Sequence, residues 1–249
     1  IVFAKNVTEV INLVAYSYAR CVLEPGDEVI ITDMEHHSNI VPWQLMRDER
    51  GLVLKYVSCT DDGEFRIEDL AKLITPKTKL ISLTHVSNVM GTVVPIKEVA
   101  KLAHEHGAKL MVDGAQAVMH MPVDVQDLDC DFYAFTGHKI YGPSGIGVLY
   151  GKAELLDAMP PFLGGGDMIL SVTMGKSTWA ALPAKFEAGT HIPAHSHPNE
   201  QITWLRKGRF EYKFGTGEVA TCTVGDLVLI PGGIEHEVWY VEDCEIVEF

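Results

Sequence analysis

The first part of the chain alternates between short apolar runs and longer amphipathic stretches. Apolar runs of four to six residues predict strands, and helical spacing between them predicts helices. Helices are expected at Ile40–Glu49, Asp69–Ile74 and Ile96–His106, the last of which stops before Gly107. Strands that alternate with helices predict βαβ units and a mostly parallel sheet. The expected strands are Glu28–Thr32, Leu52–Val57, Leu80–Thr84, Lys109–Val112, Phe132–Phe135 and Gly147–Tyr150.

The pattern changes near residue 181, where helical periodicity stops and glycines separate short strand-like segments. This texture predicts a compact antiparallel structure. We therefore predict an α/β domain at 1–180 and a small antiparallel β-barrel at 181–249, with the boundary between roughly 170 and 190. The strands expected in the barrel are Ile202–Leu205, Arg209–Phe214, Leu227–Ile230 and Val238–Val241.

Charge and composition narrow the classes of partner. The chain has 20 Lys and Arg against 34 Asp and Glu, a net charge of −14, which disfavours binding to nucleic acid or to an anionic membrane. No apolar run approaches the ~18 residues of a membrane span. The five cysteines form no C-x-x-C pair, which favours a reducing, cytoplasmic location. The apolar opening Ile1-Val2-Phe3 suggests a chain cut inside a larger domain.

Two segments carry the groups that pyridoxal phosphate (PLP) chemistry needs. That chemistry uses a lysine for a Schiff base, a carboxylate for the ring nitrogen and donors for the phosphate. Asp113 follows an apolar run, where an unpaired carboxylate is costly and a cationic ring would stabilise it. Lys139 follows another apolar run and comes after Thr136 and His138, which suit a phosphate.

These residues belong to a longer series of motifs. The series comprises Asn6–Glu9, Met34–Asn39, Thr84–Asn88, Val112–Gln116, Cys130–Tyr133, Thr136–Pro143, Gly164–Met168 and Phe186–Thr190. In content and order it resembles the class V aminotransferase-like cysteine desulfurases of the sulfur-mobilising (Suf) type, which include selenocysteine lyases. The resemblance covers residues 1–190. It implies part of the large domain of a type I PLP-dependent transferase, truncated at both ends.

The resemblance implies a role for each matching residue. Lys139 would carry PLP, Asp113 would pair with the ring nitrogen, and His36 would stack on the ring. Thr190 would reach the phosphate of a partner subunit, which implies a homodimer. The remaining contacts would be Gln116 and Asn88 to the phenolic oxygen, and Thr8, Thr136 and His138 to the phosphate.

The resemblance also implies the reaction, which is release of sulfur or selenium from cysteine or selenocysteine, with a sulfur-acceptor protein as a further partner. In the family, a nucleophilic cysteine and a substrate-binding arginine come from a C-terminal part that has no counterpart in this chain. None of its five cysteines stands in the nucleophile's context, and Cys130 matches a structural cysteine. We therefore expect PLP binding, with efficient desulfuration in doubt.

A second group of residues predicts a metal site. His195 and His197 point to the same face of a strand because side chains alternate, and Gln201 and His236 complete a set of four ligands. With the surrounding glycines, these residues resemble the two motifs of small single-domain cupins over about residues 186–249. The expected ion is divalent Fe, Mn, Zn or Ni. A weaker resemblance points to cupins that bind sugar acids.

Three interpretations stay open. The first is a PLP-dependent cysteine desulfurase or selenocysteine lyase fused to a cupin barrel. The second is a metal-binding cupin whose α/β part is only a scaffold. The third is a non-functional hybrid of two incomplete domains, natural or artificial, joined at Phe186–Thr190, a block that suits both families.

Overall fold

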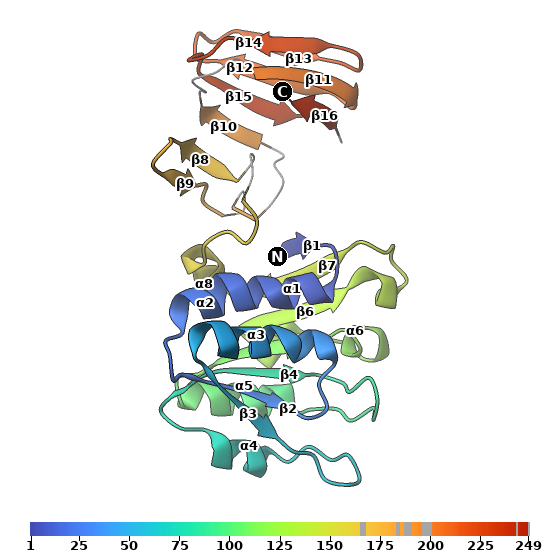
Figure 1. Ribbon diagram of the computed structural model, residues 1–249. Helices are drawn as coiled ribbons and strands as arrows, with labels where there is room; N and C mark the ends of the chain where they lie inside the picture. The colour runs from blue at the N-terminus through green and yellow to red at the C-terminus, as the bar shows by residue number, and fades with distance from the viewer. Residues whose placement is uncertain (165–167, 183–184, 187–190, 196–200, 243, 249) are drawn as a thin grey trace. The chain divides into compact units, whose positions relative to one another are not determined.

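The computed structural model describes residues 1–164, 168–182, 185–186, 191–195, 201–242 and 244–248 (Figure 1). The chain divides into two compact units, Ile1–Phe162 and Leu163–Phe249. The domain boundary that the sequence pattern predicts, between roughly 170 and 190, stays a prediction. No helix in the described ranges is long and apolar enough to cross a membrane.

The first unit is built on a seven-stranded sheet with the order β1-β7-β6-β5-β4-β2-β3. Strands β3, β2, β4, β5 and β6 run parallel, and β7 is antiparallel to both β6 and β1. The largely parallel sheet confirms the predicted fold class. Its strands are β1 (Val2–Ala4), β2 (Glu28–Thr32), β3 (Val53–Val57), β4 (Thr78–Thr84), β5 (Lys109–Asp113), β6 (Phe132–Thr136) and β7 (Gly147–Gly151).

Helices connect these strands. The three expected helices are present as α3, α4 and α5. In α5, Ile96, Val99, Ala100 and Ala103 follow helical spacing and are all buried, and the chain turns at Gly107 with a φ of +73°. The helical elements are α1 (Val7–Leu13), the π-helical η1 (Val14–Ala19), α2 (Arg20–Val22), η2 (His37–Asn39), α3 (Val41–Arg50), α4 (Ile67–Leu73), α5 (Ile96–Glu105), α6 (Ala117–His120), α7 (Val125–Leu128), η3 (Gly137–Ile140) and α8 (Ala153–Ala158).

The core of the first unit lies between the central strands and the helices. Ile30, Ile81, Leu83 and Val112 are fully buried, and α4 and α5 pack apolar residues against them. Helix α1 packs instead on β6 and β7. This contact places the start of α1 beside the ends of those strands.

Close packing of α1 on β7 depends on Gly147. A Cβ atom at Gly147 would lie 2.4 Å from the backbone carbon of Asn6, the residue whose side chain caps α1. Backbone atoms cannot rotate away, so Gly147→Ala is expected to lower the free energy of unfolding by about 3 kcal/mol. Urea denaturation measures this loss.

Gly175→Ala is the matched control, because a Cβ atom there meets nothing within 4 Å. It should leave the denaturation curve unchanged. A Gly147→Ala variant as stable as the control would contradict the close approach.

The second unit is antiparallel, as predicted. One sheet has the order β10-β15-β12-β13 and another β14-β11-β16, with a separate β8-β9 hairpin. Leu205, Phe210, Tyr212, Ile230 and Val238 are buried in its own core. Its strands are β8 (Ile169–Val172), β9 (Ser177–Trp179), β10 (His191–His195), β11 (Gln201–Lys207), β12 (Phe210–Phe214), β13 (Val219–Cys222), β14 (Leu227–Ile230), β15 (His236–Tyr240) and β16 (Glu245–Glu248).

Candidate active site

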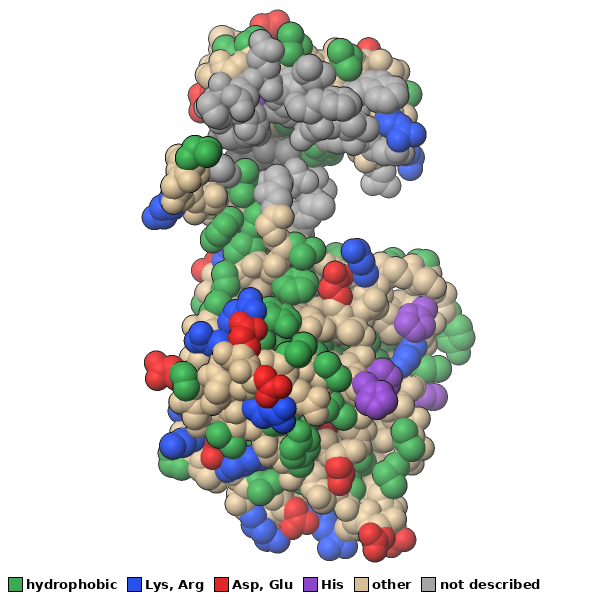
Figure 2. Space-filling view, in the orientation of Figure 1, with side chains coloured by type: hydrophobic (Ala, Val, Ile, Leu, Met, Phe, Trp, Pro, Cys, Tyr) green, Lys and Arg blue, Asp and Glu red, His purple; other side chains and the backbone are tan. Residues whose placement is uncertain are grey.

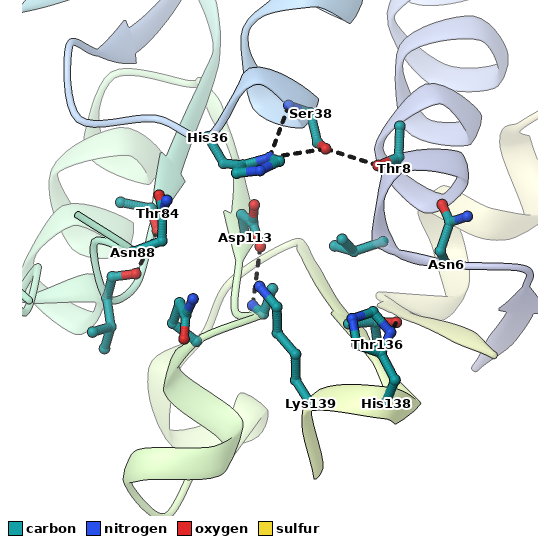
Figure 3. Close-up of a pocket in the computed structure, with 14 residues that line it drawn as sticks. Asn6, Thr8, His36, Ser38, Thr84, Asn88, Asp113, Thr136, His138 and Lys139 are labelled. Atoms are coloured by element: carbon teal, nitrogen blue, oxygen red, sulfur yellow. Dashed lines mark hydrogen bonds between the residues drawn. The ribbon is translucent and has the colours of Figure 1, made fainter. Parts of the chain in front are cut away.

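A pocket with a volume of about 320 Å³ lies where the ends of several strands meet the start of α1. Five separate segments line it: 6–8, 36–38, 84–88, 113–116 and 136–139. In an open parallel sheet, ligands bind outside the carboxyl ends of the strands, and β4, β5 and β6 end here. Figure 3 shows Lys139 reaching from η3 toward Asp113, with His36 across the space.

Asp113 is the last residue of β5 and only 4% exposed. Its Oδ1 accepts a hydrogen bond from the Ala115 amide at 2.9 Å. Burial raises the pKa of this carboxyl above its usual range, and the Ala115 amide and the charges of Lys139 and His36 oppose that rise. The strand end therefore carries a buried carboxylate that a cation in the pocket would stabilise.

Gly114 lets Tyr133 pack beside this carboxylate. A Cβ atom at Gly114 would lie 2.0 Å from the Tyr133 ring, so only glycine fits. The Tyr133 hydroxyl lies 2.9 Å from Nδ1 of His85, and burial lowers the pKa of this histidine. The two rings form an edge-to-face pair behind the pocket.

His36 is held by a short hydrogen-bonded chain. Its Nδ1 accepts from the Ser38 amide at 3.1 Å and lies 3.0 Å from the Ser38 hydroxyl. That hydroxyl lies 2.7 Å from Oγ1 of Thr8 in α1 (Figure 3). Because Nδ1 accepts from a backbone amide, the network assigns the proton of neutral His36 to Nε2. The ring is thereby fixed against α1.

Thr136 and His138 form a second fixed pair. The Thr136 hydroxyl donates to the Ile146 carbonyl at 3.1 Å and lies 3.0 Å from Nδ1 of His138. Thr136 ends β6 and His138 lies in η3, next to Lys139. On the face shown in Figure 2, histidine side chains gather on one side of the first unit.

A buried carboxylate, Glu35, lies behind His36. Its Oε1 accepts from the Thr32 hydroxyl at 2.6 Å and from the Thr84 amide at 3.0 Å, and its Oε2 accepts from Nδ2 of Asn39 at 2.7 Å. The pKa of Glu35 is raised to about 7, because burial and the charge of Asp113 together outweigh the three hydrogen bonds, which lower it.

The structure brings together eight of the nine residues predicted for PLP. They are Thr8, His36, Asn88, Asp113, Gln116, Thr136, His138 and Lys139. Thr190 lies outside the described residues. The sequence reasoning did not single out Asn6, Ser38, Thr84 or Glu35. All four lie inside the motifs that resemble the desulfurase family. Two partners of Glu35, Thr32 and Asn39, are close in sequence, but Thr84 is 49 residues away, so the burial of Glu35 has no local signal.

The predicted metal site falls mostly outside what the structure describes. His197 is not described, and for His195 and Gln201 only the strand backbone is. The backbone places His195 opposite His236 in the pairing of β10 with β15. Among the described residues, no group of three or more His, Cys, Asp or Glu is placed to hold a metal ion. The metal site stays a prediction.

The side-chain set of the pocket fits PLP. A lysine, a buried carboxylate, an imidazole held rigidly across the pocket and several hydroxyl and amide groups meet there. The Asp113 carboxylate is costly to bury and suits a protonated ring nitrogen.

Comparison with known protein families gives a match for each of the two parts of the chain. The family described as aminotransferase class-V matches residues 1–213, and the cupin domain matches 184–248. The two matches overlap at 184–213, which contains the Phe186–Thr190 block predicted to suit both families.

Curated relatives are cysteine desulfurases. That of Dickeya dadantii (strain 3937) is 59% identical over 192 residues, 76% of this chain and 46% of the relative. That of Escherichia coli (strain K12 / DH10B) is 54% identical over 191 residues, 76% of this chain and 47% of the relative. The chain spans about half the length of the curated relatives it matches.

Solved structures give the same result. The cysteine desulfurase CsdA (S-sulfonic acid) from Escherichia coli aligns with a TM-score of 0.73 and 46% identity, over 76% of this chain and 47% of that one. The cystine C-S lyase C-DES, in complex with cysteine persulfide, aligns with a TM-score of 0.67 and 31% identity, over 76% of this chain and 51% of that one.

Proposed function

Because the chain belongs to the aminotransferase class-V family, we propose that its first unit binds PLP and acts on cysteine as a desulfurase. The observation that carries this proposal is the convergence of Lys139 and Asp113 with six other predicted residues in one pocket. Similarity to cysteine desulfurases supports the choice of substrate. Selenocysteine is the alternative substrate of the same chemistry.

Each residue would act on a stated part of the cofactor or substrate. Bound PLP supplies an electron sink for a carbanion at the substrate Cα. Lys139 would bind the cofactor covalently and move the proton at Cα through Nζ. Asp113 would hold the proton on the ring nitrogen, and His36 would fix the ring plane. Thr8, Thr136 and His138 would bind the phosphate.

Sulfur release also needs a thiolate acceptor. The acceptor attacks the substrate sulfur, the Cβ–S bond breaks, and alanine and a persulfide remain. A sulfur-acceptor protein and a homodimer, with Thr190 at the partner's phosphate, are part of the proposal. An added dithiol can replace the protein acceptor in a test.

The test uses the whole chain. PLP is added, the complex is reduced with borohydride, and the modified peptide is located by mass spectrometry. We expect the added mass on Lys139, and equal amounts of alanine and sulfide from cysteine when dithiothreitol is present. Modification scattered over surface lysines would contradict a PLP site. Modification of Lys139 without alanine would retain the cofactor site and refute the desulfurase activity.

We also propose divalent metal binding in the cupin-matching part, on one observation: β10 and β15 place His195 opposite His236 in register. The other predicted ligands are His197 and Gln201. We expect the purified chain to retain about one divalent ion and His236→Ala to lose it, because each imidazole supplies one of about four ligands. Elemental analysis measures this.

His106→Ala, in the first unit, is the control and should retain the ion. Equal metal content in both variants would refute a site at His236.

A further inference from the structure

Two buried glutamates lie near opposite ends of strand β2, and both accept hydrogen bonds from threonines. Glu28 begins the strand and accepts from the hydroxyls of Thr75 at 2.7 Å and Thr78 at 2.8 Å. Glu35 follows the other end, which faces the pocket. Lys55 lies 2.8 Å from Glu28 and neutralises it, whereas Glu35 accepts from a hydroxyl, a side-chain amide and a backbone amide.

The bonds of Glu35 join three elements, of which η2 and β4 contribute residues to the pocket lining. Thr32 ends β2, Thr84 ends β4, and Asn39 ends η2. Asn39 is fixed in turn, because its Oδ1 accepts from the Ser82 hydroxyl at 2.6 Å and from Nε1 of Trp43 at 3.0 Å. Both oxygens of Glu35 are therefore bound to groups that cannot move independently.

Glu35 is linked directly to two pocket residues, to His36 by a peptide bond and to Thr84 by a hydrogen bond. The residue after Glu35 is His36, and Thr84 lines the pocket itself. Thr84 lies directly opposite Asp113 in the pairing of β4 with β5, and the His85 amide donates to the Asp113 carbonyl at 2.9 Å. A shift at Glu35 would thus move His36 and the strand end beside Asp113 together.

We propose that Glu35 is a positioning residue that fixes His36 and the end of β4 around the pocket. This proposal rests on the proposed function only where PLP affinity is the quantity measured. A carboxylate suits this place because all three partners donate. In Glu35→Gln the new NH₂ group would face the donating Nδ2 of Asn39, so the network must open on one side.

The test compares Glu35→Gln with Glu28→Gln in the whole chain. Both lose a buried carboxylate and are expected to lose stability, but only Glu35 borders the pocket. We expect PLP to bind about tenfold more weakly to Glu35→Gln, with a shifted absorption maximum. Glu28→Gln should bind PLP within about twofold of the unchanged chain. Equal effects of the two variants on PLP binding would overturn the proposal.

Hydrogen–deuterium exchange tests the same proposal without cofactor. Faster exchange is expected at residues 32–39 and at Thr84 in Glu35→Gln, and not in Glu28→Gln. If the unchanged chain binds no PLP but this exchange pattern appears, the positioning role stands and the proposed function fails. Unchanged exchange at these residues would refute the positioning role.

If Glu35→Gln does not fold, the Thr32→Val variant tests the same proposal. It removes one bond to Oε1 at nearly constant volume, and a smaller change in the same direction is expected.

Discussion

A chain with Lys139 replaced by alanine is expected to lose covalent PLP binding and its visible absorption band. The remaining pocket groups would bind the phosphate and ring without a bond to the aldehyde carbon, so the cofactor should be removed by dialysis. Activity toward cysteine should fall by about 10²- to 10⁴-fold, because the proton at Cα loses its positioned base. Absorption spectra before and after dialysis, and alanine release, measure these effects.

Two control variants separate the amine from the charge. Lys139→Arg keeps a cation near Asp113 but offers no amine that forms a Schiff base, so it should behave like the alanine variant. Lys97→Ala removes an exposed lysine of α5 that pairs with Asp127, and it should keep the band. A band that survives dialysis in Lys139→Ala would assign the covalent bond to another lysine.

Asp113→Asn is expected to weaken PLP binding and at the same time stabilise the chain without cofactor. The amide oxygen can still accept from Ala115, but the neutral side chain cannot hold a proton on the ring nitrogen. Loss of a buried ion pair corresponds to about 3–5 kcal/mol, or a PLP affinity at least about 100-fold lower. PLP titration, followed by absorption, measures the first effect.

The expected stabilisation of Asp113→Asn without cofactor follows from the pH dependence of the Asp113 carboxyl. Burial raises the pKa of the Asp113 carboxyl in the folded chain, so its favourable contribution is present below the ordinary pKa and is lost as pH rises. The Asp113→Asn variant does not lose stability in this way as pH rises, because its amide does not ionise. Without cofactor, the variant should unfold at higher urea than the unchanged chain near about pH 8, with little difference near about pH 4. A variant less stable at both values would contradict a strained carboxyl.

Much of the pocket could be predicted from the sequence because its central groups follow apolar runs. Asp113 is the last residue of β5 and Lys139 lies in η3, which follows β6, and a parallel sheet gathers strand ends at one edge. His36 and Asn88 have no such local signature, and only the ordered motifs of a family indicated them. Both line the pocket all the same.

Other features could not be predicted because they depend on contacts distant in sequence. Glu35 belongs to the Met34–Asn39 motif, but its burial depends on packing against the end of β4, where the Thr84 amide, 49 residues away, donates to it. The short edge strand β1 pairs with β7, which lies almost 150 residues further along the chain. The apolar pattern around Val2 alone does not distinguish such an edge strand from a loop.

Because five segments form the pocket, ligand binding is expected to stabilise the folded chain and so lengthen its lifetime. Residues 6–8 and 136–139 meet only when α1 has packed on β6 and β7, so a ligand of this pocket binds the folded state alone. At a ligand concentration 100 times Kd, such binding adds about 2.7 kcal/mol to the free energy of unfolding. Starvation for the ligand would then expose the first unit to proteases, so cofactor supply would set the abundance of the protein.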